Sequence, residues 1–478
     1  MNMLLKPTER PEREEPLEVV CAALSGAIGQ PSPPQRLPMK RLLLPALLAL
    51  AALSGRAEVA DYYPMIVRAD QEATVTLVFT NEPALAATNV LEVVASCADG
   101  EPSNTVVVPA AIDGNILTVT PFFHGETEQT LSVSQKFPGT TKKPRLLGVA
   151  RLYSLAPDYF ALRPYRGNLH MHSKFSDGRK DETPAMMVAT CRKLGFDFAV
   201  ETDHHSYAAS VEAVEAFAKL PTDMKTFPGE EVHSPGNRVH ILSLGASESM
   251  TDWFNTRSNE YNAAVAEAKS ALPDSMTPIT RTSIAASFVI WDRIRSRGGL
   301  AVFCHPYWRP KYRQYIPAAA SDYILHSGKF DAMEVLNTDS SDLGILMYNE
   351  LRAEGLKIPG IGVTDAHAAA SLANAYTLVL AEKPDFPAIA KNIRLRNCAA
   401  VDVDTVSGRQ NVIGEFRFSR YAIFLIKNFY PRQNAVCQKE GALLLQALAG
   451  GTNAVAAVAQ LKETQGTTPA LRVKYWQP

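Results

Sequence analysis

The stretch RGNLHMHSKFSDG (166–178) decides how the rest of this sequence is interpreted. It contains an HxH pair, His170 and His172, and Asp177 lies on the adjoining loop. Residues i and i+2 of a strand point to the same side, so both imidazoles can reach one metal ion. A single HxH pair is a weak signal, and its meaning depends on the motifs further along the chain.

Four more polar motifs follow strand-like apolar runs, in order along the chain. They are VETDHH (200–205), PGEEV (228–232), FCHP (303–306) and VTDAH (363–367), while His240 lies early in VHILSL (239–244). Chance alone does not account for five such motifs, each placed after a strand-like run. Neutral imidazole and carboxylate together suit zinc, manganese or iron. The candidate ligands exceed one coordination sphere, which indicates more than one metal ion.

Strand-like and helix-like segments alternate over residues 163–400. The apolar runs begin at FDFAV (196–200) and end at IPGIGV (358–363), with amphipathic stretches between them. The first helix has Thr183 as N-cap, Pro184 in its first turn and Gly195 after its end. This alternation predicts an α/β fold with a parallel sheet. About 240 residues suffice to close a barrel whose strand ends converge on one pocket.

The flanking segments differ from this pattern. Residues 61–160 contain six short β-rich runs between turn signals, which predicts a small all-β, sandwich-like domain without a catalytic cluster. Residues 410–478 are predicted to be helical, with one apolar face that packs against the barrel. Binding of that face to a membrane surface is the alternative. Pro431 is expected to stop the first of these helices.

The N-terminal part has the composition of a leader. Residues 1–38 are polar and proline-rich, which predicts disorder or a wrongly assigned start before Met39. Residues 39–57 combine a basic start, a short apolar run and a small-residue end, as in a secretory signal cut after Ala57. The run is too short to span a bilayer. We therefore expect export, to a periplasm or the exterior.

Composition excludes several classes of protein. The 478 residues are 46% hydrophobic and 20% charged, which argues against wholesale disorder and against a multi-span membrane protein. The net charge of -1 lacks the basic excess of a nucleic-acid-binding protein, so no nucleic-acid partner is expected. Six cysteines, five of them after export, form no CxxC pair, and their pairing stays open.

Taken together, LHMHSKFSDG, VETDHH, PGEEV, FCHP and VTDAH resemble the PHP family, the polymerase and histidinol phosphatase superfamily, over about 163–400. The resemblance implies a distorted (β/α)7 barrel with two or three divalent metal ions at the strand ends. Glu334 and Asn337 also match a family pattern. The metal ligands that it implies are His170, His172, Asp177, His204, Glu231, His240, His305, Asp365 and His367.

Other residues are expected to serve the reaction around this site. Asp365 can take a proton, and His205 or His240 can protonate a leaving oxygen. Arginine forks match phosphate oxygens well, and three arginines lie beside the ligand motifs: Arg179, Arg238 and Arg309. Cys304 is expected in the core, and His326 matches no motif.

These features predict a metal-dependent hydrolase acting on a small-molecule substrate. Phosphoester hydrolysis is the leading reaction. Carboxylester or carbamate hydrolysis at the same site is an alternative, because the flanking β domain and the export signal resemble an exported, carbamate-hydrolase-like PHP subgroup. A module that binds metal or glycan without catalysis is the alternative from another class.

Overall fold

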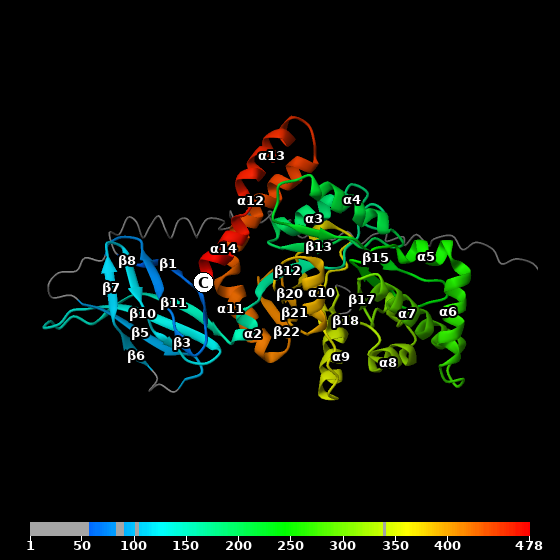
Figure 1. The fold of residues 1–478 in the computed structure, drawn as a ribbon, viewed down its shortest axis with the longest axis horizontal. Helices are drawn as coiled ribbons and strands as arrows, with labels where there is room; N and C mark the ends of the chain where they lie inside the picture. Colours follow the sequence, from blue (N-terminus) through cyan, green and yellow to red (C-terminus); the bar gives the residue numbers. More distant parts are fainter. Residues whose placement is uncertain (1–56, 83–89, 101–104, 338–340) are drawn as a thin grey trace, which may run out of the picture. The chain divides into compact units, whose positions relative to one another are not determined.

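A computed structural model describes residues 57–82, 90–100, 105–337 and 341–478 of the chain (Figure 1). The segment 1–38 and the predicted secretory signal up to residue 56 lie outside the described residues. From residue 57 onward the described residues belong to one unit, which contains strands first, alternating strands and helices next, and helices last.

The first part of the described chain contains two antiparallel-rich sheets. One has the order β1-β4-β8-β7, and these strands span Val59–Tyr63, Val75–Phe79, Ile116–Val119 and Ala110–Asp113. The other has the order β2-β11-β10-β5-β6, spanning Ile66–Arg68, Arg145–Leu155, Thr127–Lys136, Val90–Cys97 and Val106–Val108. Buried and partly buried residues alternate along β10 and β4 because successive side chains point to opposite faces. The buried faces of both sheets share one hydrophobic cluster.

Two further sheets carry the candidate site. One has the order β14-β13-β12-β20-β21-β22, spanning Lys225–Phe227, Phe198–Val200, Arg163–Asn168, Ala375–Ala381, Cys398–Val403 and Gln410–Gly414. The other has the order β15-β16-β17-β18-β19, spanning Gly229–Val232, Ile241–Leu244, Leu300–Phe303, Ala332–Leu336 and Gly360–Gly362. Single bridges pair His204 with Glu231 and Met171 with Ala366. These bridges link β13 to β15 and β12 to β19, so seven strands follow one another in a ring.

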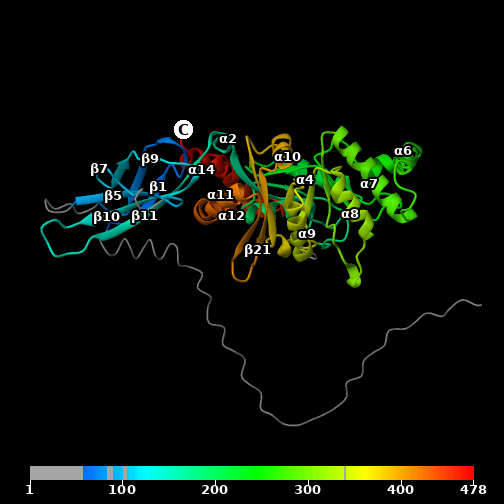
Figure 2. The same cartoon turned by 90° about the horizontal axis from the view of Figure 1, so that it is seen from below.

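Helices connect and cover these strands (Figures 1 and 2). They are α3 (Pro184–Lys193), α4 (Tyr207–Ala218), α5 (Met250–Thr256), α6 (Ser258–Ser270), α7 (Pro278–Ser296), α8 (Ala318–Ser327), α9 (Ser341–Ala353) and α10 (Phe386–Arg394). Helix α3 begins as expected, since the Thr183 hydroxyl accepts a hydrogen bond from the Met186 amide. The predicted mixed α/β architecture is confirmed at this level.

The expected parallel sheet is only partly present. Strand β16 runs antiparallel to both β15 and β17, whereas β12–β13, β17–β18 and β18–β19 are parallel pairs. The connection 233–240 between β15 and β16 is shorter than the crossover of about a dozen residues that a parallel pair needs. The short link therefore requires β16 to reverse direction.

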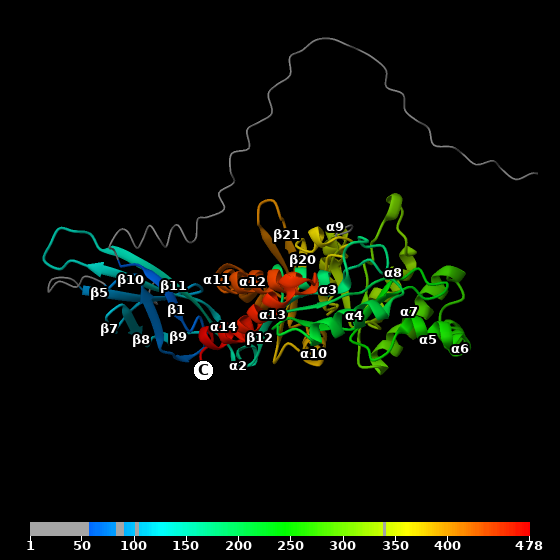
Figure 3. The same ribbon diagram turned by 90° about the horizontal axis from the view of Figure 1, so that it is seen from above.

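The predicted helical segment 410–478 begins with a strand, β22, and is helical from Phe416 onward. Its helices are α11 (Phe416–Asn428), α12 (Tyr430–Leu448), α13 (Thr452–Thr464) and α14 (Thr467–Tyr475). Pro431 lies in the first turn of α12, so it begins a helix as well as following one. Figure 3 shows α11 to α14 beside strands of both parts of the chain.

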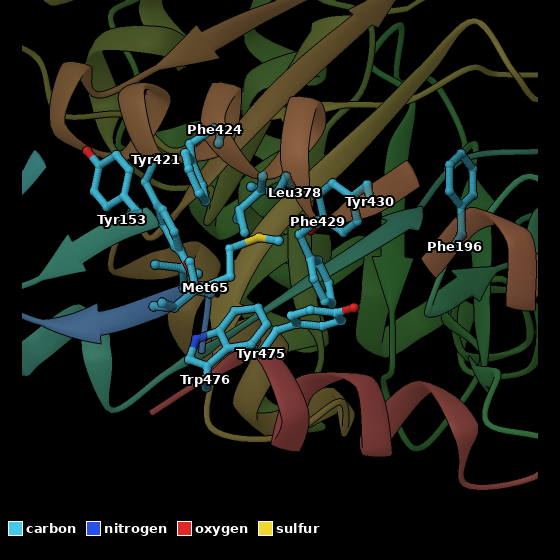
Figure 4. Close-up of a cluster of buried hydrophobic side chains, with 14 of the residues drawn as sticks. Met65, Tyr153, Phe196, Leu378, Tyr421, Phe424, Phe429, Tyr430, Tyr475 and Trp476 are labelled. Atoms are coloured by element: carbon cyan, nitrogen blue, oxygen red, sulfur yellow. The ribbon is translucent and has the colours of Figure 1, made fainter. Parts of the chain in front are cut away.

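The apolar face of α11 is buried inside the protein. The rings of Tyr421 and Phe424 lie 5.0 and 5.3 Å from the ring of Tyr153 on β11. Trp476, just after α14, packs edge-on against Phe429 at 4.9 Å (Figure 4). Helix α11 also contacts β21 and β22, so it joins the first sheets to the sheet that contains β12. Within the described ranges, no helix has the length and apolarity needed to cross a bilayer.

The five described cysteines form no disulfide. They are Cys97, Cys191, Cys304, Cys398 and Cys437, and all but Cys97 are buried. Burial raises the pKa of the Cys191 and Cys398 thiols, so these side chains behave as small core residues.

A buried ion pair fastens helix α12 to helix α3. The carboxylate of Glu440 accepts hydrogen bonds from Arg192 Nε at 2.9 Å and from the Asp223 amide at 2.9 Å. The Thr222 hydroxyl donates to the same carboxylate. Both charged side chains have no exposed surface. Removing one partner of such a pair leaves an uncompensated buried charge.

We expect Glu440→Ala to lower the free energy of unfolding by about 3–5 kcal/mol, because Arg192 would lose its nearest anionic partner and keep only Asp197 and Asp223 at 3.7 and 3.9 Å. Chemical denaturation followed by circular dichroism measures this change. The exposed pair of Glu128 and Arg151 provides the control, and Glu128→Ala should cost no more than about 1 kcal/mol. Equal effects of the two variants would contradict the assignment.

Candidate metal centre

The polar motifs converge because they occupy one end of the ring of strands. His170 and His172 follow β12, His204 follows β13, and His305 follows β17. Asp365 follows β19. The antiparallel direction of β16 brings its first end, which His240 precedes, to the same place as the last ends of its parallel neighbours.

The Glu231 carboxylate lies at the centre of the cluster and is completely buried. Its Oε2 atom lies 2.9 Å from His170 Nε2, 3.3 Å from His172 Nε2 and 3.1 Å from His204 Nδ1. Its Oε1 atom faces three more imidazoles, those of His233, His240 and His305, at 3.4, 2.9 and 3.2 Å. Burial acts to raise the pKa of Glu231, but the surrounding imidazoles hold it well below its ordinary value.

One donor set of four residues contains His170, His172, Glu231 and Asp365, whose ligand atoms lie within 4.8 Å of one another. His172 Nε2 is 2.8 Å from Asp365 Oδ1 and 3.2 Å from His170 Nε2. Two imidazole nitrogens and two carboxylate oxygens thus face one point. A divalent cation at that point would satisfy the lone pairs of all four, so these residues fit a metal ion.

A second donor set lies nearer the surface. It contains His172, Asp177, His204 and His367. Asp177 Oδ2 is 3.4 Å from His204 Nε2 and 3.2 Å from His367 Nε2. Burial acts to raise the pKa of Asp177, but the hydrogen bonds from both imidazoles lower it below its ordinary range. The carboxylate is therefore ionised, as a cation ligand must be.

A third donor set uses the other oxygen of Glu231, which faces His240 and His305. Burial lowers the pKa of His240 to about 4, so its ring is neutral and keeps a lone pair for a cation. Cys304 also lies near this set, but burial raises the pKa of its thiol well above the ordinary value. A protonated thiol is a poor ligand, in line with its expected core position.

All nine residues that the sequence resemblance implies as ligands thus lie in three overlapping donor sets. His172 belongs to the first and second sets, and Glu231 belongs to the first and third. The two residues expected to support these ligands also contact them. Glu334 accepts from the His305 amide at 2.8 Å and faces His170 Nδ1 at 2.6 Å, while Asn337 donates to Asp365 Oδ2 at 3.1 Å.

Sequence reasoning did not single out the residues that hold the loop after β12. The Asp203 carboxylate accepts hydrogen bonds from the Ser173 amide at 2.8 Å and from the hydroxyls of Ser173 and Ser176. This carboxylate ties the HxH loop to the loop that carries His204. The position of Asp203 directly before His204 in the sequence is the signal that could have identified this residue.

The pocket over the donor sets has a volume of about 370 Å³. Two aromatic residues, Trp308 and Tyr315, form part of its wall, with ring centroids 5.0 Å apart. The remaining lining residues are Asp177, His204, His233, His240, His305, Asp365 and His367.

None of the three arginines expected to bind substrate lines this pocket. Arg179 is largely exposed and pairs with Asp181, and Arg238 lies over the Tyr315 ring at 5.1 Å. Arg309 is likewise absent from the lining. His205 also lies outside the lining, with its ring 4.8 Å from that of His233. Among the described residues, the pocket wall therefore contains no arginine or lysine.

Backbone conformation marks three of these positions. Asp365 has φ of 49°, His205 has φ of 56° and His305 has φ of 22°, positive values that residues other than glycine seldom adopt. Such conformations persist where surrounding contacts enforce them, and they cluster at functional sites. The turn at Asp365 directs its carboxylate toward His170 and His172.

Comparison with known proteins gives no assignment by sequence: no family model and no curated protein matches the chain. Among solved structures, one similar protein is assigned as a metal-dependent phosphoesterase from Bifidobacterium adolescentis, at 18% identity and a TM-score of 0.31. That match covers 50% of this chain and 98% of the other.

Two further structures have similar scores. An amidohydrolase from Chromobacterium violaceum has 18% identity and a TM-score of 0.28, covering 43% of this chain and 89% of its own. PsfC from Pseudomonas syringae has 14% identity and a TM-score of 0.31, covering 56% and 99%. Two of the three are described as hydrolases. Scores this low do not assign a family or a reaction to this chain.

We expect Glu334→Ala to lower the free energy of unfolding of the metal-free protein by about 2–4 kcal/mol, because a buried amide and a buried imidazole would lose their acceptor. Urea denaturation in the presence of a chelator measures the change. Glu354, an exposed carboxylate beside His326, is the control, and Glu354→Ala should change stability by less than about 0.5 kcal/mol. A Glu334→Ala variant as stable as this control would refute the expectation.

Proposed function

We propose that this chain is a metal-dependent hydrolase of the PHP type that binds two or three divalent ions and cleaves a phosphoester. The observation that carries the proposal is the buried Glu231 carboxylate, which six imidazoles surround with ring nitrogens facing its two oxygens. Imidazole and carboxylate donors fit manganese, zinc or iron.

Divalent ions held there would activate water near neutral pH and offset the negative charge of the reacting group. The chain's own residues set the geometry. Asp365 lines the pocket, and its Oδ2 atom is fixed by Asn337 while its Oδ1 atom faces the two HxH imidazoles. We assign Asp365 as the proton acceptor. The neutral ring of His240 is better suited to donate a lone pair than a proton.

Carboxylester or carbamate hydrolysis is a second candidate, and the pocket wall favours it. A phosphoester would bring a dianionic group into a pocket whose described wall contains no arginine or lysine. The rings of Trp308 and Tyr315 instead offer contact to an apolar or aromatic group of the substrate. For a phosphoester, the metal ions themselves would have to neutralise the substrate.

We also propose that the protein is exported, as the composition of residues 39–57 indicates. N-terminal sequencing of protein recovered from the periplasm or medium tests this. A mature N-terminus at Glu58 would support export, whereas an uncleaved cytoplasmic product would refute it.

We expect the purified protein with manganese or zinc to hydrolyse 4-nitrophenyl phosphate or 4-nitrophenyl acetate, and a chelator to abolish this activity. His172→Ala should lower kcat/KM at least 100-fold, because His172 belongs to two donor sets. His326→Ala is the matched control, since this exposed imidazole lies outside the cluster and contacts Glu354.

The two substrates separate the candidate reactions. Phosphate release alone supports the phosphoesterase, and acetate release alone supports the ester or carbamate hydrolase. If the wild type binds metal but hydrolyses neither substrate, a module that binds without catalysis is favoured. The same holds if His172→Ala and His326→Ala have equal rates.

His233 is expected to orient His204 for its cation. His233 Nε2 lies 3.0 Å from His204 Nδ1, and its ring stacks on His240 at 3.6 Å between centroids. If the oxygens of Glu231 held cations, His233 Nε2 would remain as the acceptor for a proton on His204 Nδ1. Groups that orient a ligating imidazole in this way raise metal affinity.

We therefore expect His233→Asn to weaken binding of at least one metal ion about 10- to 100-fold, measured by calorimetric titration of chelator-treated protein. His326→Asn should leave the affinity unchanged. If the wild type binds metal and His233→Asn binds it with the same affinity, His233 has no orienting role. The proposal of a metal centre would then still stand.

A further inference from the structure

A second, larger cavity lies at the opposite end of the strands from the metal centre. It has a volume of about 490 Å³. Arg163 and Tyr165 come from the start of β12, Lys225 from the start of β14, and the rest mostly from α14 and the residues after it. The lining residues are Arg163, Tyr165, Asp197, Asp223, Lys225, Pro384, Thr468, Pro469, Arg472, Val473, Trp476, Gln477 and Pro478.

The acidic residues of this cavity already have internal partners. The Asp197 carboxylate lies 2.9 Å from Arg472 Nη2 and accepts hydrogen bonds from the Arg166 amide at 3.0 Å and from Gln433 Nε2 at 3.1 Å. The Asp223 carboxylate accepts from the amides of Gly466 and Thr468, at 2.8 and 3.1 Å. The charge of Arg472 is likewise balanced by Asp197.

Two cations remain without an acidic partner. Arg163 and Lys225 form no ion pair with any described residue within 4.0 Å, although both line the cavity. Arg163 donates from Nη1 to the carbonyls of Phe160 and Leu162, both at 2.9 Å, and no hydrogen bond to a described residue uses its Nε or Nη2. Burial lowers the pKa of Arg163, as expected for a half-buried cation without a counter-charge.

The cavity wall also offers an apolar surface next to these cations. The Arg163 guanidinium lies 5.6 Å from the Trp476 ring, and Arg472 lies 4.6 Å from the Tyr165 ring. Pro384, Pro469 and Val473 complete this part of the wall. A concave, mostly apolar site with a few charged groups is typical of small-molecule binding.

We propose that this cavity binds a small organic anion, with the anionic group held by Arg163 and Lys225 and an apolar or aromatic body against Trp476. The free edge of the Arg163 guanidinium presents Nε and Nη2 side by side, which matches the two oxygens of a carboxylate, phosphate or sulfonate. This site is separate from the metal centre and does not depend on the proposed hydrolase activity.

The test is fluorescence titration of the full chain with 8-anilinonaphthalene-1-sulfonate, in chelator so that metal plays no part. We expect saturable binding at one site and at least tenfold weaker binding to the double variant Arg163→Ala, Lys225→Ala. Removing the paired, exposed cations Lys136 and Arg151 in a control double variant should leave the affinity unchanged.

The uncharged probe N-phenyl-1-naphthylamine separates charge recognition from simple apolar adsorption, because its binding should not respond to the loss of the two cations. Circular dichroism and metal content verify that each variant folds. The proposal is overturned if the sulfonate fails to bind wild type, or if it binds the cation-depleted variant and the wild type equally.

Discussion

Burial of the Glu231 carboxylate is the constraint around which the rest of the structure is organised. An ionised carboxylate without exposed surface is costly unless positive or hydrogen-bonding groups surround it. Six imidazoles do so, and the arrangement of strands brings them together from separate segments of the chain. The two bridges that join the sheets are therefore part of the site, and one of them pairs His204 with Glu231 itself.

The direction of β16 brings a further imidazole to the Glu231 carboxylate. A parallel β16 would place His240, which precedes the strand, at the far end of the ring. The short connection 233–240 reverses the strand and brings His240 Nδ1 to 2.9 Å from Glu231 Oε1. The same short turn carries His233, so one hairpin supplies three neighbouring groups of the cluster. A local limit on loop length thus decides which residues meet.

The sequence predicted which backbone segments carry the candidate site, but it did not predict where the long arginine side chains lie. HxH and DxH pairs could be interpreted because alternation along a strand fixes where short side chains point. The reach of an arginine depends on tertiary partners that the sequence does not display. Arg238 lies over Tyr315, and Arg179 pairs with Asp181, so neither enters the pocket. The antiparallel β16 and the aromatic wall likewise depend on how distant segments pack, which periodicity alone does not specify.

Buried charged side chains have different kinds of partner at the two ends of the ring of strands. At the C-terminal helices, Arg192 meets Glu440 and Arg472 meets Asp197, so each of these charges is balanced by a neighbouring side chain. At the candidate metal centre, four carboxylates lie among imidazoles whose nitrogens also face one another, as His170 and His172 do at 3.2 Å. Two facing nitrogens can share one proton in a hydrogen bond. A single proton cannot bond to the lone pairs of four converging ligand atoms. A cation with four or more ligands can, so the excess of lone pairs at this end supports the proposed metal centre.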